Sequence, residues 1–249
     1  MNESTLQKMK NLKFFGMLRA FRTTLEAEQM NRYTPDEMVA FLIESEWDDR
    51  HNRKVERILK NAKFRYKASI EDIIYSDKRN LTKNDIHRLA DCTFIEKKQV
   101  IIITGSTGVG KSYLASALGH QACINGYKVF YANMTKLIGK LKMAKADGSY
   151  VRELLKMERQ DLLILDDFGL QPLDTQGRAC LMEIIEDRHG KSSLIITSQV
   201  PVKQWYDIIG EKTIADAILD RIVHDTTRIE LKGESLRKRK MVEADMDNE

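Results

Sequence analysis

A glycine-rich octapeptide that directly follows an apolar run limits this chain to very few folds. Residues 105–112 are Gly-Ser-Thr-Gly-Val-Gly-Lys-Ser, which fits the pattern G-x-x-x-x-G-K-[ST] at every fixed position, and they follow the run Val-Ile-Ile-Ile-Thr at 100–104. In such a loop the glycines let backbone N–H groups approach phosphate oxygens, and the N-terminus of the next helix adds positive potential. The sequence therefore predicts a strand, a phosphate-binding loop and a helix that begins near Lys111.

This loop assigns a role to each residue in binding a nucleoside triphosphate. Lys111 is expected to reach the β- and γ-phosphates and to act in catalysis, and Ser112 to offer its hydroxyl to Mg²⁺. A chance match is the alternative, and the strand–loop–helix setting argues against it. The predicted phosphate-binding residues are Gly105, Ser106, Thr107, Gly108, Val109, Gly110, Lys111 and Ser112.

Two adjacent carboxylates follow another strand-like run, Leu-Leu-Ile-Leu at 162–165. Open α/β sheets bind their ligands at the carboxyl ends of the strands, where Asp166 and Asp167 would lie. We expect Asp166 to hold Mg²⁺ and Asp167 to orient the water that attacks the γ-phosphate. A solvated pair at a strand end is the alternative, which the neighbouring phosphate loop disfavours.

A third strand-like run, 193–197, leads into Ser198 and Gln199. The same sheet edge would bring Gln199, or Ser198, to the γ-phosphate or to its attacking water. The alternative is that these polar residues cap a helix that opens at Pro201.

The pattern of apolar residues divides the chain into two regions. Before Lys98 the spacing is helical, and Thr34-Pro35-Asp36-Glu37 fits a capped helix start. After Lys98, short β-branched runs at 100–104, 128–132, 162–165, 194–197 and 226–231 alternate with segments of helix length. The fold class predicted is α/β, a doubly wound parallel five-stranded P-loop domain preceded by a small all-α domain. We expect a helical DNA- or partner-binding domain at 1–70, a helical connection at 71–98 and the nucleotide domain at 99–249.

Composition excludes several classes of protein. The apolar runs are far shorter than the roughly 20 residues of a membrane helix, and the polar N-terminus lacks a signal-peptide pattern, so we expect a cytoplasmic protein without membrane contact. Three widely spaced cysteines and five scattered histidines form neither a disulfide framework nor a zinc site. Of the 41 Lys and Arg and 37 Asp and Glu, residues 1–98 hold 20 and 16, so the basic excess lies there.

Residues 50–67 carry eight basic side chains and one acidic side chain, so their net charge is larger than that of residues 1–98 as a whole. Their spacing places several on one helical face, opposite an apolar stripe. We expect contact with the phosphates of double-stranded DNA; a solvated face is the alternative. The predicted DNA-binding residues here are Arg50, Arg53, Lys54, Arg57 and Lys60.

Taken together, the order of motifs resembles a known family. The glycine-rich loop, Asp166-Asp167, Ile-Thr-Ser-Gln at 196–199, the segment 213–222 and Gly-Glu-Ser-Leu-Arg at 233–237 are similar to the IstB-like ATP-binding proteins, which are transposition helper ATPases of insertion sequences. That family is related to DnaC-type helicase loaders in the initiator branch of the AAA+ ATPases. The resemblance spans nearly the whole chain.

This resemblance implies roles that spacing alone does not. Arg221 would be an arginine finger that enters the ATP site of a neighbouring subunit, a role whose alternative is a surface ion pair. Arg237 would be a second arginine near the nucleotide, and the alternative is that it belongs to a solvated basic tail, 237–240. It also implies that basic side chains after the second strand line a DNA path in the assembly; a solvated helix is the alternative. Those predicted DNA-binding residues are Lys140, Lys142 and Lys145.

Two departures from the wider AAA+ pattern matter. Asp167 stands where a glutamate is usual, so hydrolysis is expected to be slow without a partner. Only residues 232–249 follow the last predicted strand, too few for the helical lid of most members.

The function implied is that of an ATP-dependent, DNA-binding, oligomeric AAA+ ATPase that delivers or activates a transposase at target DNA, with ATP and Mg²⁺ as its ligands. The alternative partner is a replicative helicase, as for a DnaC-type loader. A passive DNA-bending scaffold and a small-molecule kinase are the rivals from other classes. No residue set for adenine stands out; Phe94 and Ile95 are candidates, but a buried core position is the better interpretation for both.

Overall fold

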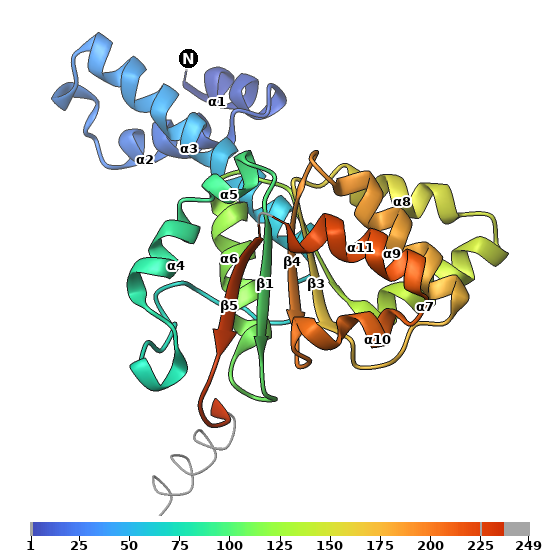
Figure 1. The fold of residues 1–249 in the computed structure, drawn as a ribbon. Helices are drawn as coiled ribbons and strands as arrows, with labels where there is room; N and C mark the ends of the chain where they lie inside the picture. The colour runs from blue at the N-terminus through green and yellow to red at the C-terminus, as the bar shows by residue number, and fades with distance from the viewer. Residues whose placement is uncertain (1, 225, 237–249) are drawn as a thin grey trace, which may run out of the picture. The chain divides into compact units, whose positions relative to one another are not determined.

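The computed structural model describes residues 2–224 and 226–236, and the chain forms two compact units that divide between Arg57 and Ile58. This division falls within the long helix α3 (Pro35–Ala62), earlier in the chain than the boundary at residue 70 in the sequence analysis. Figure 1 labels the helices and strands of both units. In the described ranges, no helix is long and apolar enough to cross a bilayer.

The first unit is helical, with α1 (Asn2–Asn11), α2 (Phe15–Glu26), the short η1 (Met30–Arg32) and most of α3. The predicted capping box is present: the backbone N–H of Thr34 donates to Glu37 Oε2 at 2.8 Å, and that of Glu37 donates to Thr34 Oγ1 at 3.3 Å. Pro35 takes the first helical position, where its missing N–H costs nothing.

A buried carboxylate joins α2 to α3. Glu46 Oε2 accepts the backbone N–H of Gly16 at 2.8 Å and that of Met17 at 3.3 Å, which satisfies donors at the N-terminus of α2 and complements the helix dipole. A Cβ on Gly16 would lie 2.1 Å from the carbonyl oxygen of Ser45, so only glycine permits this approach.

The second unit is a five-stranded parallel sheet in the order β2-β3-β4-β1-β5. Its strands are β1 (Val100–Gly105), β2 (Val129–Asn133), β3 (Leu162–Phe168), β4 (Ser193–Ser198) and β5 (Thr226–Leu231). Its helices are the end of α3, η2 (Asp77–Arg79), α4 (Lys83–Ala90), α5 (Thr93–Glu96), α6 (Lys111–Ile124), α7 (Met134–Ala146), α8 (Tyr150–Glu158), α9 (Thr175–Arg188), η3 (Val202–Gln204), α10 (Trp205–Ile209) and α11 (Lys212–Val223). The predicted five strands and the α/β class are confirmed.

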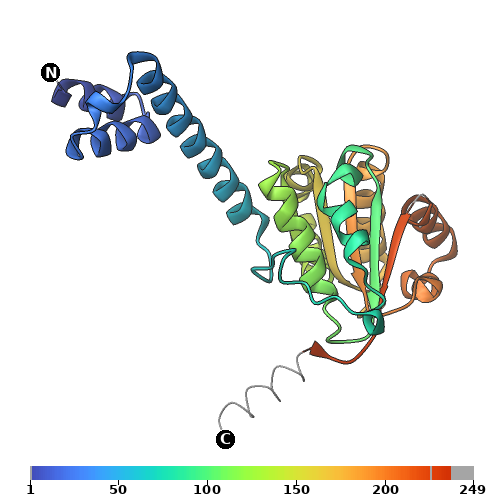
Figure 2. The same ribbon diagram turned by 90° about the vertical axis from the view of Figure 1, so that its left-hand side faces the viewer.

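Alternation along β1 explains why the sheet is buried on both faces. Ile101 and Ile103 point into a core formed with α4, α5 and α6, whereas Ile102 points into a second core formed with α7, α9, α10 and α11. Figures 1 and 2 show the two layers of helices on either side of the sheet. A strand covered on both faces has to be apolar at every position, which is the pattern that identified these strands.

The connections create a crevice at one edge of the sheet. β1 continues into α6 on one face, whereas its neighbour β4 continues into α10 and α11 on the other face. Such a reversal opens a crevice outside the carboxyl ends of the two strands. The loops that follow β1 and β4, residues 106–110 and 199–201, lie at this point.

Residues 63–76 span the end of the expected helical domain (1–70) and the start of the expected helical connection (71–98), and they differ from both expectations. Residues 63–76 contain no helix, and Phe64, Tyr66, Ala68 and Ile70 pack against the core that contains α6. Apolar side chains alternate here with Arg65, Lys67 and Ser69, which is the period of an extended chain. The alternation from Phe64 to Ile70 is visible in the sequence and predicts an extended segment where a helix was expected.

The three cysteines Cys92, Cys123 and Cys180 are all buried and unpaired, as their spacing predicted. Burial, and next the nearby Cys92, raise the pKa of Cys123 to about 12. At neutral pH this residue therefore remains an apolar thiol.

One buried arginine connects the starts of two strands, and its replacement is expected to be strongly destabilising. Burial lowers the pKa of Arg188 to about 10, so it is charged at neutral pH, and its guanidinium donates to four backbone carbonyls, those of Met157, Gln160, Asp161 and Ser193. Arg188→Met removes the side-chain donor of these four carbonyls and should reduce the free energy of unfolding by about 3 kcal/mol. Urea unfolding measures this, with the exposed Arg159→Met as control; equal losses in both variants would contradict the role.

Candidate functional site

The loop after β1 has the conformation that wraps an anion. Gly108 and Gly110 have φ angles of +86° and +97°, and the buried Lys111 begins α6 and donates from Nζ to the carbonyl oxygen of Ser106 at 2.8 Å. The fourteen-residue α6 directs its N-terminus at the same loop. Residues 105–112 thus form the strand–loop–helix that the sequence predicted, with a lysine and a helix dipole directed at one place.

The segment after β5 packs on this loop. The backbone N–H of Leu236 donates to the carbonyl of Gly108 at 3.0 Å, and a Cβ on Gly108 would lie 2.1 Å from Ser235 Oγ. Glycine is therefore required at 108 both for its φ and for this contact. Arg237, the next residue, lies outside the described residues.

The two carboxylates lie in a bulge of β3. Asn133 pairs with Asp166, and the pairing with β4 skips from Leu165–Ile196 to Phe168–Ser198, so that Asp166 and Asp167 together face the single residue Thr197. Thr197 Oγ1 donates to Asp166 Oδ1 at 2.5 Å and accepts the backbone N–H of Asp167 at 3.0 Å. Asp167 has φ of +62°, which is rare for a residue with a side chain and is held by this arrangement.

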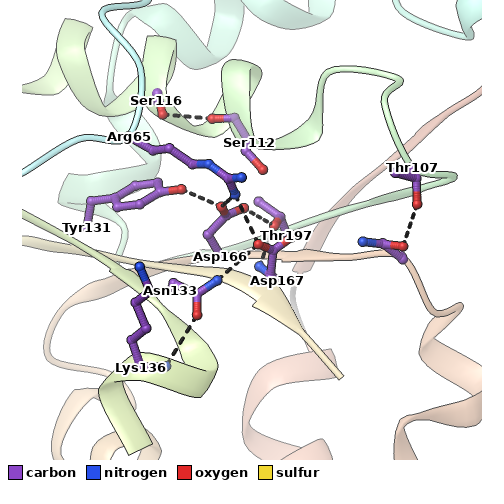
Figure 3. Close-up of polar contacts among 11 residues, drawn as sticks. Arg65, Thr107, Ser112, Ser116, Tyr131, Asn133, Lys136, Asp166, Asp167 and Thr197 are labelled. Atoms are coloured by element: carbon purple, nitrogen blue, oxygen red, sulfur yellow. Dashed lines mark hydrogen bonds and ion pairs between the residues drawn. The ribbon is translucent and has the colours of Figure 1, made fainter. Parts of the chain in front are cut away.

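Asp166 and Asp167 differ in their surroundings. The side chain of Asp166 is fully buried and accepts a hydrogen bond from Tyr131, a residue of β2. Burial first, and next the hydrogen bond to Asp166, raise the pKa of Tyr131. The phenol therefore remains protonated and is the donor of this hydrogen bond. Asp167 is 14% exposed and accepts from Asn133 Nδ2 at 3.0 Å. A buried oxygen donor for a cation thus lies beside a more open carboxylate that can face water (Figure 3).

Gln199 lies at the crevice beside the phosphate loop, whereas Ser198 is buried within the fold. Thr107 Oγ1 donates to Gln199 Oε1 at 2.6 Å, which joins the loops after β1 and β4 across the crevice. Ser198 is buried, donates to the carbonyl of Phe168 at 2.7 Å and accepts from the N–H of Val200. Its hydroxyl is used within the fold, and no side chain caps η3.

A cavity of about 740 Å³ opens beside these residues. Its polar wall includes Thr107, Lys111, Ser112, Asp167 and Gln199. Its apolar wall comes from the extended segment, the turn between η2 and α4, the start of α6 and the segment after β5, namely Tyr66, Ile73, Ile74, Leu81, Tyr113, Leu114 and Leu236. A cavity with a phosphate-binding end and an apolar end of this size is suited to a nucleotide.

Phe94 and Ile95, considered for adenine, are buried in the core beneath α5. The expectation that both are core residues, and not contacts of adenine, is therefore confirmed.

Sequence reasoning missed two arginines of this cavity. Arg79 donates to the carbonyl of Val109 at 2.6 Å and also to that of Ile74, so it connects the phosphate loop to the extended segment; burial lowers its pKa. Arg65 Nη1 lies 3.1 Å from Asp167 Oδ2 and 3.5 Å from Asp166 Oδ2. No motif marks either residue, because both reach the site from a segment distant in sequence.

Arg221 lies at the opposite end of the sheet from the phosphate loop. It lines a smaller cavity together with Gln99 and Val100, at the start of β1, and its Nη2 lies 2.8 Å from Glu186 Oε2. The six residues of β1, about 17 Å long, separate this end from Gly105. Arg221 therefore cannot reach the phosphate loop of its own chain.

The basic side chains of the first unit compensate buried carboxylates. Arg50 Nε lies 2.6 Å from Glu46 Oε1, and Arg53 Nε lies 2.6 Å from Asp49 Oδ2. Their side chains remain 55% and 45% exposed. For Lys54, the structure gives no ion pair within the described ranges, and the same holds for Arg57 and Lys60.

The lysines of α7 also have acidic partners. Lys140 pairs with Glu153, Lys142 Nζ lies 2.6 Å from Asp174 Oδ2, and Lys145 Nζ lies 3.8 Å from Glu183 Oε1. The stretch contains no acid of its own, so these partners could be found only in three dimensions. Their charge is partly compensated within the chain.

Fold and site together define a P-loop nucleotide-binding domain with the fold of AAA+ domains. By fold it is similar to DnaA from Aquifex aeolicus bound to AMPPCP, with a TM-score of 0.59 and 18% identity over 75% of this chain and 57% of that one. It is likewise similar to the DnaC helicase loader, with a TM-score of 0.55 and 22% identity over 67% of this chain and 98% of that one. At this identity the likeness concerns the fold.

Sequence comparison identifies the family. The model of the IstB-like ATP binding protein family matches residues 7–244, and the chain belongs to this family. It is 43% identical to an insertion sequence ATP-binding protein of Sinorhizobium fredii, over 94% of this chain and 96% of the relative. The resemblance drawn from the motifs is therefore confirmed.

Proposed function

We propose that this protein is an ATP-hydrolysing, DNA-binding AAA+ ATPase that assembles on duplex DNA and delivers or activates a transposase there. The observation that carries the proposal is the joining of Lys111, the Asp166–Asp167 bulge and Gln199 around one cavity, in a chain of the IstB-like family. A transposase is favoured over a replicative helicase because the relatives are named as insertion sequence proteins. A cytoplasmic location is consistent with this role.

Within the cavity, each residue has a distinct task. Lys111 and the N–H groups of residues 105–112 bind the phosphates, and Ser112 and Asp166 are oxygen donors of the kind Mg²⁺ prefers. Bound Mg²⁺ neutralises charge on the phosphates. Asp167 accepts a hydrogen bond from the attacking water and orients it, while Gln199 contacts the γ-phosphate or that water. Arg237 is proposed to approach the nucleotide, since Leu236 donates to Gly108.

Hydrolysis requires a second subunit in this proposal. Arg221 is remote from the phosphate loop of its own chain, so it can complete only a neighbour's site. ATP then stabilises the contact between subunits, and its hydrolysis weakens that contact.

DNA binding is proposed for two separate segments, α3 and α7. Within the described residues, Lys54, Arg57 and Lys60 of α3 form no ion pair, and Arg50 and Arg53 add exposed charge. Lys140, Lys142 and Lys145 would have to exchange carboxylate partners for phosphates. A lysine–phosphate contact is weak alone, so several subunits on one duplex are needed for useful affinity.

Particle size and duplex binding, measured on one sample with ATP, ADP or no nucleotide, test the proposal. We expect large particles on DNA with ATP but not with ADP or without nucleotide. A protein that stays monomeric with ATP and does not bind DNA would contradict the proposal.

The basic residues of α3 are tested by the salt dependence of DNA binding. Lys54→Ala, Arg57→Ala and Lys60→Ala should each reduce the slope of log affinity against log salt by about 0.9. Lys10→Ala, on α1, is the control and should leave the slope unchanged.

A further inference from the structure

Arg65 brings a positive charge to both carboxylates of the proposed Mg²⁺ site. Its Nη1 contacts Asp167 and Asp166 at 3.1 and 3.5 Å, although its own side chain is 43% exposed. A guanidinium thus reaches from the solvent side to a buried acidic pair. Figure 3 shows it pointing at the carboxylates from the side on which α6 carries Ser112.

The neighbours of Arg65 fix its direction. The Phe64 ring packs at 5.5 Å from the ring of His120 on α6 and at 6.2 Å from that of Tyr131 on β2. On the other side, the Tyr66 ring lies 6.2 Å from that of Tyr113, and the Arg65 guanidinium lies over it at 5.5 Å. With both flanking rings held against α6, the side chain between them is directed at the end of β3.

The acidic pair needs a positive charge in every state of the protein. Two adjacent carboxylates in a buried setting repel each other and are costly without a compensating cation. Arg65 supplies that charge in this structure, and Mg²⁺ would supply it when ATP is bound. The two cations repel each other and compete for the same oxygens, so they exclude one another.

We propose that Arg65 is a latch: it holds Asp166 and Asp167 in the nucleotide-free protein and releases them when Mg²⁺ and ATP bind. The inference rests on the proposed ATP site and adds a regulation to it. Arg65 follows the last residue of α3, Ala62, by three positions. Release therefore removes the ion pairs between this segment and the end of β3, while the rings of Phe64 and Tyr66 keep the segment packed against α6.

Two measurements on Arg65→Ala test the latch, with the exposed Lys67→Ala of the same segment as control. In EDTA without nucleotide, Arg65→Ala should melt at a lower temperature than wild type, because the acidic pair loses its cation. In a titration with a fluorescent ATP analogue, it should need about tenfold less Mg²⁺ for half-maximal binding, the factor that about 1.4 kcal/mol produces. Lys67→Ala should match wild type in both, and Arg65→Lys should lie between.

The opposite result in the titration overturns the inference. If Arg65→Ala needs more Mg²⁺, or binds ATP more weakly at saturating Mg²⁺, then Arg65 is a ligand of the nucleotide. If it matches wild type in both measurements, the contact is only a surface ion pair. Failure of the proposed function is distinct, because then wild type itself binds no ATP at any Mg²⁺ concentration.

Discussion

Lys111→Ala is expected to lower the affinity for ATP by about 100-fold. The ammonium group is buried at the start of α6 and held at the phosphate loop by the Ser106 carbonyl, so its charge is already in place for the phosphates. A hydrogen bond between charged groups contributes about 1.5–3 kcal/mol, and the upper value corresponds to more than 100-fold in affinity. Equilibrium titration with a fluorescent ATP analogue measures the loss.

The control for this variant is Lys203→Ala, which removes an exposed lysine in η3 and should bind ATP as wild type does. Circular dichroism verifies that both variants are folded. An unchanged affinity for ATP in Lys111→Ala would contradict the assignment of this cavity as the ATP site.

The same variant separates the proposed ATPase from the passive DNA-bending scaffold. A scaffold needs no nucleotide, so Lys111→Ala should bind duplex DNA as wild type does. In an ATP-dependent assembly, cooperative DNA binding should disappear together with ATP binding, because each subunit alone makes few phosphate contacts. Retained cooperative binding in Lys111→Ala would favour the scaffold.

The fold was predictable where one local rule decides the structure. Strands covered on both faces must be apolar throughout, so β1, β3 and β4 were visible as Ile and Leu runs, and the capping box marked the start of α3. The segment 63–76 was mistaken for helix because its alternating period lies within a helical context. The alternation of apolar and polar side chains from Phe64 to Ile70 is itself a local signal of an extended chain.

The site was predictable only in part, since motifs specify residues and not their partners. The bulge that brings Asp166 and Asp167 to Thr197 depends on the pairing of β3 with β4, which no local pattern encodes. By contrast, the acids that pair with Arg50 and Arg53 lie four residues before them, a spacing that could have indicated ion pairs on one helix. Partners of Lys140 and Lys142 come from elements that meet α7 only after folding.

Arg221→Ala is expected to lower the ATPase rate by about 10³-fold, the lower end of the effect of an arginine finger, while ATP binding to the monomer stays unchanged. The reason is geometric: Arg221 lies at the start of β1 and the phosphate loop at its end, so the residue can act only on a neighbour. Its ion pair with Glu186 positions it in the free subunit. Glu186→Gln removes that pair, keeps the arginine and should retain most of the rate.

Mixing two inactive variants tests whether Arg221 acts between subunits. Lys111→Ala keeps the arginine but has an impaired ATP site, whereas Arg221→Ala keeps the ATP site but lacks the arginine. An interface between an Arg221→Ala subunit and a neighbour that supplies Arg221 is complete, so the mixture should recover a rate well above that of either variant alone. No recovery, or a loss of ATP binding in monomeric Arg221→Ala, would show that Arg221 acts within its own subunit, by supporting the start of β1 and the end of α11.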